Sequence, residues 1–163
     1  MRKLDYYKYT ASPRTNKLRP ALTGVFHDNG MKVASDAQIL VAVKESYPEE
    51  FEGKIVGKNG EYVEGKYPKY NLIRPGKGDL RRNYIGVDRD GSFTIEAVHK
   101  VDGENVETVD IMQSRFNKKL FEKLCKAMDR IGTNVIYVSR NPLMPCFAEG
   151  PDGWAMLMPI VKA

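Results

Sequence analysis

The chain has 163 residues, with 26 Lys and Arg against 21 Asp and Glu, and so a formal net charge of +5. This length suits one domain that can build a core without metal or disulfide staples, and we expect residues 1–163 to form it. No apolar run approaches the ~20 residues of a membrane-spanning helix. The start of the chain lacks the apolar centre of a secretion signal. Two cysteines, Cys125 and Cys146, make no disulfide framework, so we expect a cytoplasmic protein.

The first half of the chain carries patterns typical of strands and tight turns. Strands are expected over 22–27, over 31–43 as one or two strands, and over 54–56 and 61–63. Turns at Asp28-Asn29-Gly30 and Asn59-Gly60 join them, because Asn-Gly tolerates positive φ. A short helix is expected either within 76–84 or in the N-terminal segment.

The second half contains the one strong helical pattern. Strands are expected over 93–98 and 106–111, joined at Asp102-Gly103. The helix is expected from Ser114 as its N-cap to Ile131, with Gly132 ending it. Its apolar residues recur at helical spacing: Phe116, Leu120, Leu124, Ala127 and Ile131. Further strands are expected over 135–138, 146–148 and 154–161. The predicted fold class is therefore α+β, rich in antiparallel strands, with one or two helices.

No residue pattern indicates catalysis. His27 and His99 lie in strand-like segments without a second ligand at metal spacing, so we expect no metal site. The two cysteines carry no mark of a reactive thiolate. The clusters 57–60 and 76–78 combine Gly with Lys but lack the spacing of a phosphate-binding loop. An enzyme is accordingly the minor hypothesis, and no cofactor is predicted.

Basic residues form a stripe along the predicted helix. Four of them fall within about 60° of one another, roughly 100° from the apolar stripe. They are Lys119, Lys123, Lys126 and Arg130. Such a stripe is either a solvated helix face or a contact for phosphates. A second basic cluster, on a predicted loop that could reach the same ligand, comprises Arg74, Lys77, Arg81 and Arg82. No aromatic residue interrupts the stripe, which favours duplex backbone over stacked single strands.

Three segments together resemble the bacterial sliding clamp, the beta subunit of the replicative DNA polymerase. The first is Arg19-Pro20-Ala21-Leu22-Thr23-Gly24-Val25 followed by residues 33–40, and it resembles the clamp pattern RPxLxGV … ATDxxRLA. The second, residues 64–75 around Tyr67-Pro68-Lys69-Tyr70, is similar to xGxFPDYxxVLP. The third begins at Phe116-Asn117 and closes on residues 154–160, and it resembles FNxxYLxxxL … YLxMPxR.

The resemblance implies a sliding-clamp-like fold and a non-enzymatic processivity factor. In the family, helices carrying Lys and Arg line a ring around duplex DNA, and an apolar cleft holds short linear peptides of replication or repair proteins. Carried over to this chain, the DNA contacts are the two basic clusters. The implied cleft residues are Ser35, Ala37, Gln38, Ile39, Leu40, Pro68, Ile73, Met156, Met158, Pro159 and Ile160.

The chain also departs from the family pattern. Gln38-Ile39 replaces a His-Arg pair, Lys69 replaces an Asp, and Val161 replaces the closing Arg. A clamp subunit has three domains and this chain has room for about one, so encircling DNA would require a homo-oligomer. Edge strands at 1–9 or 154–161 are the expected contacts between copies. The alternatives are a monomeric peptide-binding module and an enzyme on a clamp-like fold.

Overall fold

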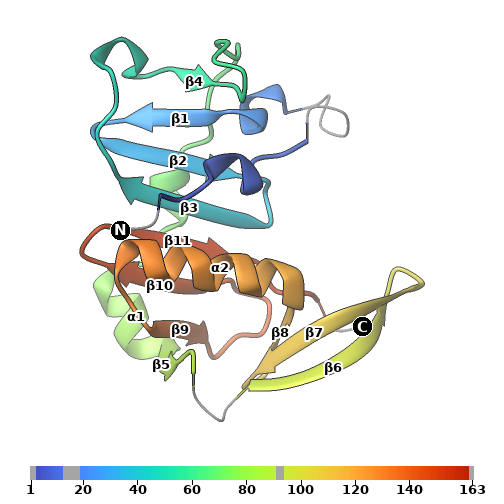
Figure 1. The fold of residues 1–163 in the computed structure, drawn as a ribbon. Helices are drawn as coiled ribbons and strands as arrows, with labels where there is room; N and C mark the ends of the chain where they lie inside the picture. Colours follow the sequence, from blue (N-terminus) through green and yellow to red (C-terminus); the bar gives the residue numbers. More distant parts are fainter. Residues whose placement is uncertain (1–2, 13–18, 91–93, 162–163) are drawn as a thin grey trace.

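A computed structural model describes residues 3–12, 19–90 and 94–161, and its main element is one long antiparallel sheet (Figure 1). Its eight strands lie in the order β4-β1-β2-β3-β11-β10-β9-β5. Their bounds are β1 Val25–Asp28, β2 Met31–Ser35, β3 Ile39–Lys44, β4 Ile55–Val56, β5 Tyr84–Asp88, β9 Val135–Ser139, β10 Cys146–Gly150 and β11 Gly153–Leu157. A smaller antiparallel sheet contains β6 Thr94–Val101, β7 Glu104–Ile111 and β8 Ser114–Asn117.

Two α-helices and four short 3-10 turns complete the described fold. They are α1 Lys77–Asn83, α2 Lys118–Ile131, η1 Tyr6–Lys8, η2 Pro20–Thr23, η3 Glu49–Phe51 and η4 Tyr70–Ile73. The prediction of a short helix within 76–84 is confirmed by α1, and the β-rich α+β class is confirmed as well. No helix among the described residues is both long enough and apolar enough to cross a membrane.

The pairing of β3 with β11 joins the two halves of the chain in one sheet. Their register runs from Ile39↔Leu157 to Val43↔Gly153. Gly153 has φ +146°, and a Cβ there would collide with the Ala42 carbonyl, so the close approach of the strands requires glycine. Because β11 is flanked by β3 and β10, the expectation that residues 154–161 offer a free edge for another copy is wrong. The strand also ends at Leu157, and the other expected edge, 1–9, contains η1 and no described strand.

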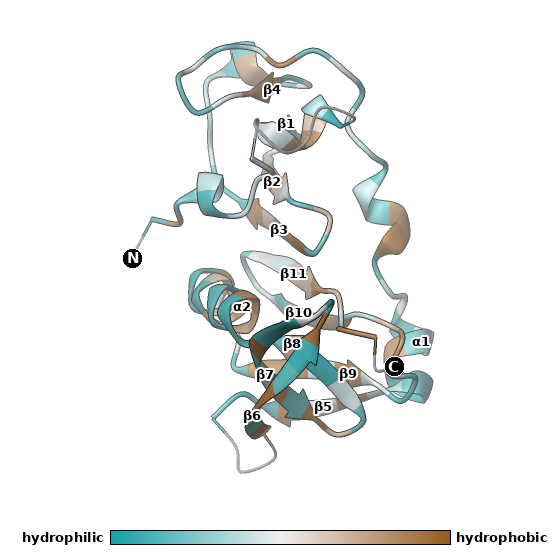
Figure 2. Cartoon of the chain, turned by 90° about the vertical axis from the view of Figure 1, so that its right-hand side faces the viewer, coloured by the Kyte–Doolittle hydropathy of each residue, from teal (hydrophilic) through white to brown (hydrophobic). Residues whose placement is uncertain are grey.

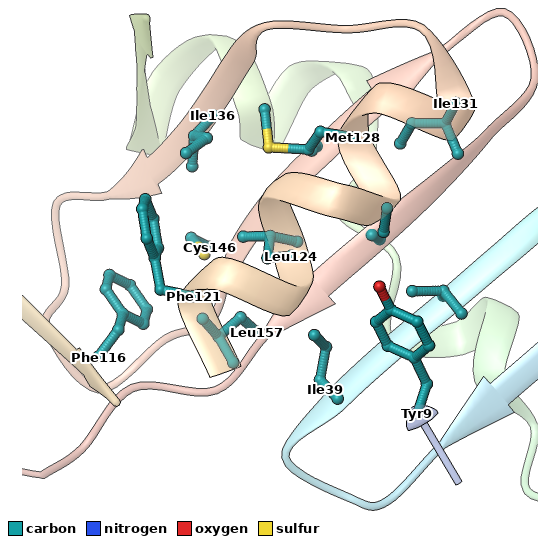
Figure 3. Packing of buried hydrophobic residues seen from close by; sticks show 14 of the residues in the cluster. Tyr9, Ile39, Phe116, Phe121, Leu124, Met128, Ile131, Ile136, Cys146 and Leu157 are labelled. Carbon is teal, nitrogen blue, oxygen red and sulfur yellow. The ribbon is translucent and has the colours of Figure 1, made fainter. Parts of the chain in front are cut away.

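Side-chain alternation along the strands builds one core on each face of the sheet. Ala155 and Leu157 of β11 face the core under α2, which includes Leu124, Met128 and Ile131 (Figure 3). Trp154 and Met156 face the opposite core, which includes Tyr67, Tyr70 and Phe147 and against which Leu80 of α1 packs. The two helices therefore lie on opposite faces of the sheet, as Figure 2 shows.

Helix α2 begins three residues later than the sequence indicated. Asn117, and not Ser114, is its N-cap, with the side-chain oxygen accepting from the Leu120 N–H at 3.2 Å. Residues 114–117 instead form β8, which pairs with β7, so Phe116 is a buried strand residue. Asn caps a helix at least as well as Ser, and the strand pairing decides between the two. Gly132 ends the helix at φ 84° as predicted.

Other strand bounds differ from the predicted ones for local reasons. β1 begins at Val25 because Pro20–Thr23 adopts a 3-10 turn. Residues 61–63 contribute only a single bridge, Val56↔Tyr62, to the sheet. Residues 31–43 resolve into the two strands β2 and β3. Phe93, the first residue of another predicted strand, lies outside the described residues, and that strand extends to Val101.

Candidate functional site

An apolar groove of about 600 Å³ opens on the face of the sheet that carries Trp154, and we call it the groove. The β2–β3 turn, the segment through η4, the loop before β10 and the end of β11 form its walls. Its lining residues are Arg19, Leu22, Ser35, Ala37, Gln38, Ile39, Leu40, Tyr67, Pro68, Lys69, Tyr70, Leu72, Ile73, Leu143, Met144, Pro145, Met156 and Met158. Among these described lining residues, two are cations and none is a carboxylate.

Large apolar side chains stand exposed around this groove. Leu72 is 76% exposed, Leu143 is 58% exposed and Ile73 is 57% exposed. Met144 and Met158 are also exposed. Single exposed apolar residues are ordinary, but a contiguous set around a concave surface is typical of a binding site. Met adapts its shape to different apolar partners, which suits a groove that accepts more than one sequence.

A tightly hydrogen-bonded turn holds one wall of the groove. The Asp36 carboxylate accepts from the N–H groups of Gln38 at 2.8 Å and Ile39 at 2.9 Å. The Ser35 hydroxyl accepts from the Ala37 N–H at 3.1 Å. Ala37 itself has φ 77°, a left-handed conformation that costs a residue with a Cβ about 1–2 kcal/mol. The turn thus keeps a strained alanine, with an exposed methyl group, on the groove wall.

Stacked aromatic rings form a rigid support beneath η4. Tyr70 stacks on Trp154 with ring centroids 6.0 Å apart, and its hydroxyl donates to the Asp28 carboxylate at 2.8 Å. Tyr67 stacks on Phe26 at 4.7 Å. Burial raises the pKa of both tyrosines, so both stay neutral at physiological pH. The floor of the groove beneath η4 is therefore formed by packed aromatic side chains.

The structure brings together most of the cleft residues named from the sequence. All of them line the groove except Pro159 and Ile160, and Ile160 instead bridges to Arg115 of β8. Sequence reasoning missed several lining residues, among them Tyr67, Leu72, Leu143 and Met144. The pair Leu143-Met144, an apolar dipeptide between Pro142 and Pro145, was the available signal for the loop.

The basic stripe on α2 is split between solvent and internal contacts. Lys119 and Lys126 are exposed. The Lys123 ammonium donates to the Lys8 carbonyl at 2.9 Å. Arg130, whose side chain is only 10% exposed, donates to the Lys44 carbonyl at 3.2 Å and pairs with Glu45 at 3.5 Å. Half of the stripe therefore already serves to fix the N-terminal segment and the end of β3 to the helix.

The second basic cluster lies on the other face of the sheet. Lys77, Arg81 and Arg82 belong to α1, not to a loop, and are exposed. Arg74 pairs with Glu149 and lies over the Trp154 ring at 5.4 Å. Because α1 and α2 flank opposite faces, the expectation that both clusters reach one ligand site is wrong (Figure 2).

The titratable groups do not assemble into a catalytic arrangement among the described residues. Burial raises the pKa of Cys146 to about 12 and also raises that of Cys125, which disfavours thiolate chemistry. His27 is buried beside Tyr47. Among the described residues, its ring forms no hydrogen bond with another histidine or with a cysteine. No group of three or more His, Cys, Asp or Glu in the described part of the chain is placed to hold a metal ion.

The fold is that of bacterial sliding clamps. The Caulobacter crescentus beta sliding clamp matches with a TM-score of 0.62 and 15% identity, over 97% of this chain and 62% of the clamp. The Bacillus subtilis DNA polymerase sliding clamp matches with a TM-score of 0.56 and 15% identity, over 97% and 60%. The Helicobacter pylori beta clamp, in a structure with a DNA ligase peptide bound, matches with a TM-score of 0.54 and 17% identity, over 96% and 62%.

These likenesses establish a clamp-like architecture. The chain spans less than two thirds of the length of the clamps it matches. No family model matches the sequence, and no curated protein matches it either. Sliding clamps as a group are not enzymes.

Proposed function

We propose that this chain is a non-catalytic, clamp-like docking protein whose groove holds a short apolar peptide of a partner protein. The observation that carries the proposal is the exposed apolar rim around a concave, rigidly supported surface. In a soluble domain, an exposed apolar surface of this kind usually marks the binding site of a partner. The continuous β3–β11 pairing supports one domain over residues 1–163.

The charges at the groove favour a peptide that carries carboxylates. Among the described residues that line the groove, the ionisable ones are Arg19, Lys69 and the two neutral tyrosines. Lys69 is exposed beside η4. Complementary charge at the rim of an interface mainly sets specificity and the association rate. We therefore expect acidic residues next to the apolar anchors of the bound peptide.

Selection from a displayed library of short random peptides tests this proposal. Selection on the wild-type chain should enrich apolar sequences with flanking Asp or Glu, and Lys69→Glu should shift the flanks toward Lys or Arg. Met158→Asp should weaken each selected peptide about tenfold or more, because it places a charge in an apolar contact.

The matched control is Met112→Asp. Met112 is 46% exposed and Met158 is 45% exposed, but Met112 lies in the β7–β8 turn away from the groove. Peptide affinity should survive this change. The groove would be rejected as the binding site if the selected peptides bound Met158→Asp and Met112→Asp as tightly as the wild type. It would also be rejected if the selection enriched no peptide.

A second candidate function is contact of the α2 face with the backbone of duplex DNA. The N-terminal segment adds two exposed lysines to this face, because Lys3 and Lys8 border the same 540 Å³ hollow as Lys126. Lys119 is exposed on the same helix. Asp5 and Asp129 also border the hollow and reduce its positive potential. The contacts would be electrostatic and independent of sequence.

Salt dependence distinguishes the two basic faces. Each phosphate contact contributes about 0.9 to the slope of log affinity against log salt concentration. Lys119→Gln with Lys126→Gln should therefore lower the slope for duplex DNA by about 2, whereas Lys77→Gln with Arg81→Gln should leave it unchanged. If only the α1 variant lowered the slope, the DNA contact would lie on α1. If the wild type bound no DNA measurably, this second candidate function would be rejected.

A further inference from the structure

The outer strand of the β6–β7 hairpin has an unpaired edge (Figure 1). β6 pairs with β7 from Thr94↔Ile111 to Val101↔Glu104, and no described residue pairs with its other side. Two of its aliphatic side chains face solvent, since Ile95 is 67% exposed and Val98 is 61% exposed. A long strand edge with exposed apolar side chains is a template for pairing with another strand.

The charged and the large aliphatic residues of β6 are placed symmetrically about Val98. Glu96 and Lys100 stand two residues before and after it, and Ile95 and Val101 stand three residues before and after it. Charged residues on an edge strand ordinarily oppose strand addition. Here the two charges have opposite signs at symmetric positions, so an antiparallel second copy places each Glu96 opposite Lys100. Val98 then faces Val98, and Ile95 faces Val101.

Backbone geometry restricts which registers two copies of β6 can adopt. Successive residues direct their N–H and C=O groups to alternate sides of a strand, and directly opposite residues must face in the same sense. Residues of opposite parity therefore cannot stand opposite each other. A register centred on Ala97 sets Glu96 against Val98, and one centred on His99 sets Lys100 against Val98. In the register centred on Val98, Glu96 of each copy stands opposite Lys100 of the other copy, so two ion pairs form.

We propose that two copies of this chain associate by antiparallel pairing of their β6 strands, centred on Val98. The interface is isologous, with the same strand used by both copies, and it fuses their three-stranded sheets into one. Glu96 already accepts from Lys118 at 3.2 Å, and Lys100 of the second copy gives it a further partner. β6 residues do not line the groove, so this association is independent of peptide binding.

Sedimentation equilibrium between about 1 μM and about 1 mM measures the association. The wild type should show a monomer–dimer equilibrium. Lys100→Glu sets like charges opposite each other at two symmetric places and should weaken the dimer about tenfold. The charge exchange Glu96→Lys with Lys100→Glu should restore it. Lys77→Glu, an equal charge change on α1, should have no effect.

Disulfide trapping tests the register itself. Directly opposite residues of antiparallel strands have Cα atoms about 4.5–5.5 Å apart, within disulfide reach. Val98→Cys should therefore form a linked dimer under mild oxidation. Glu96→Cys alone should not, since its own counterpart lies about 13 Å along the strand. Mixing the Glu96→Cys and Lys100→Cys proteins should produce linked heterodimers. The wild type, with Cys125 and Cys146 only, gives the background.

Three results would overturn the proposal. A wild type that stays monomeric at the highest concentration excludes the dimer. An association that continues past two copies excludes a closed two-fold pair. A dimer that Lys100→Glu leaves intact, with no trapping at Val98→Cys, places the contact elsewhere. Thermal unfolding of each variant, compared with the wild type, ensures that a lost dimer reflects the interface rather than the fold.

Discussion

The two faces of the eight-stranded sheet use their side chains in different ways. On the α2 face, long side chains close over the sheet, and even charged groups such as Arg130 are drawn into internal contacts. On the opposite face, large apolar residues such as Leu72 and Leu143 stand in solvent around the groove. A surface that satisfies its own groups has mainly a structural role, whereas one that leaves apolar area exposed is available to a partner. Substitutions of the buried and internally bonded residues on the first face should therefore affect stability, and substitutions at the groove rim on the second should affect peptide binding.

A leucine truncation on each face should give the largest contrast. Leu124 of α2 is fully buried, so Leu124→Ala should lower the free energy of unfolding by about 2–5 kcal/mol. The same truncation at Leu143 should change it by less than about 0.5 kcal/mol and weaken peptide binding instead. Urea denaturation measures the first quantity. Equal losses of stability would show that the groove rim belongs to the core.

The next contrast lies within α2. Arg130→Leu removes the donor to the Lys44 carbonyl and one of the two cations that pair with Glu45, which keeps Lys32 at 2.7 Å. It should lower the free energy of unfolding by about 1–3 kcal/mol. Lys126→Leu, one turn earlier on the exposed side, should change it by less than about 0.5 kcal/mol. Thermal unfolding of the two variants compares them directly. Similar values would mean that the contacts of Arg130 contribute nothing net to stability.

A smaller effect of opposite sign is expected at the groove wall. Ala37→Gly relieves a left-handed alanine and should raise the free energy of unfolding by about 0.5–1 kcal/mol. Ala97→Gly, in extended β6, should lower it by about 0.5–1 kcal/mol. Peptide affinity should fall in the first variant, because the exposed methyl group leaves the groove. A destabilised Ala37→Gly protein would contradict the strain.

The smallest expected effect is a pH dependence on the α2 side. Burial lowers the pKa of His27 below its usual 6.5 despite its hydrogen bond to the Lys54 carbonyl. The unfolded chain then binds a proton more readily than the folded one below pH 6.5, so stability is lost as the pH falls through that value toward the folded pKa. His27→Gln should flatten this part of the profile between about pH 7 and about pH 5. If the slope did not change, the titration of carboxylates and not of His27 would cause this pH dependence.

Local patterns in the sequence predicted local structure well. Asn29-Gly30 and Asp102-Gly103 form the expected turns, and Gly132 ends the helix, because each depends on its own φ preference. The predicted start of α2 was wrong because Ser114 and Asn117 are both good N-caps, and only the pairing of β8 with β7 distinguishes them. The alternation of apolar and polar residues along a strand also could not reveal that β11 lies between β3 and β10.

The candidate site was predictable where a motif covered it and not elsewhere. The segments 33–40, 64–75 and 154–160 supplied most of the cleft residues that line the groove. Leu143 and Met144 lie between those segments and reach the groove only through the three-dimensional fold. The internal partners of Lys123 and Arg130 were equally hidden, since Lys8, Lys44 and Glu45 are remote in sequence. Helical spacing locates a basic stripe but does not reveal what each cation contacts.

The position of β11 has a consequence for how the chain folds during synthesis. β3 hydrogen-bonds on one side to β2, which precedes it, and on the other to a strand more than one hundred residues later. The first half of the sheet therefore leaves the ribosome with an exposed, apolar strand edge that stays open until residues 153–157 emerge. Such an edge invites aggregation, and the long loop that it must close slows folding. Nascent chains stalled before Gly153 should accordingly be protease-sensitive and bound by chaperones.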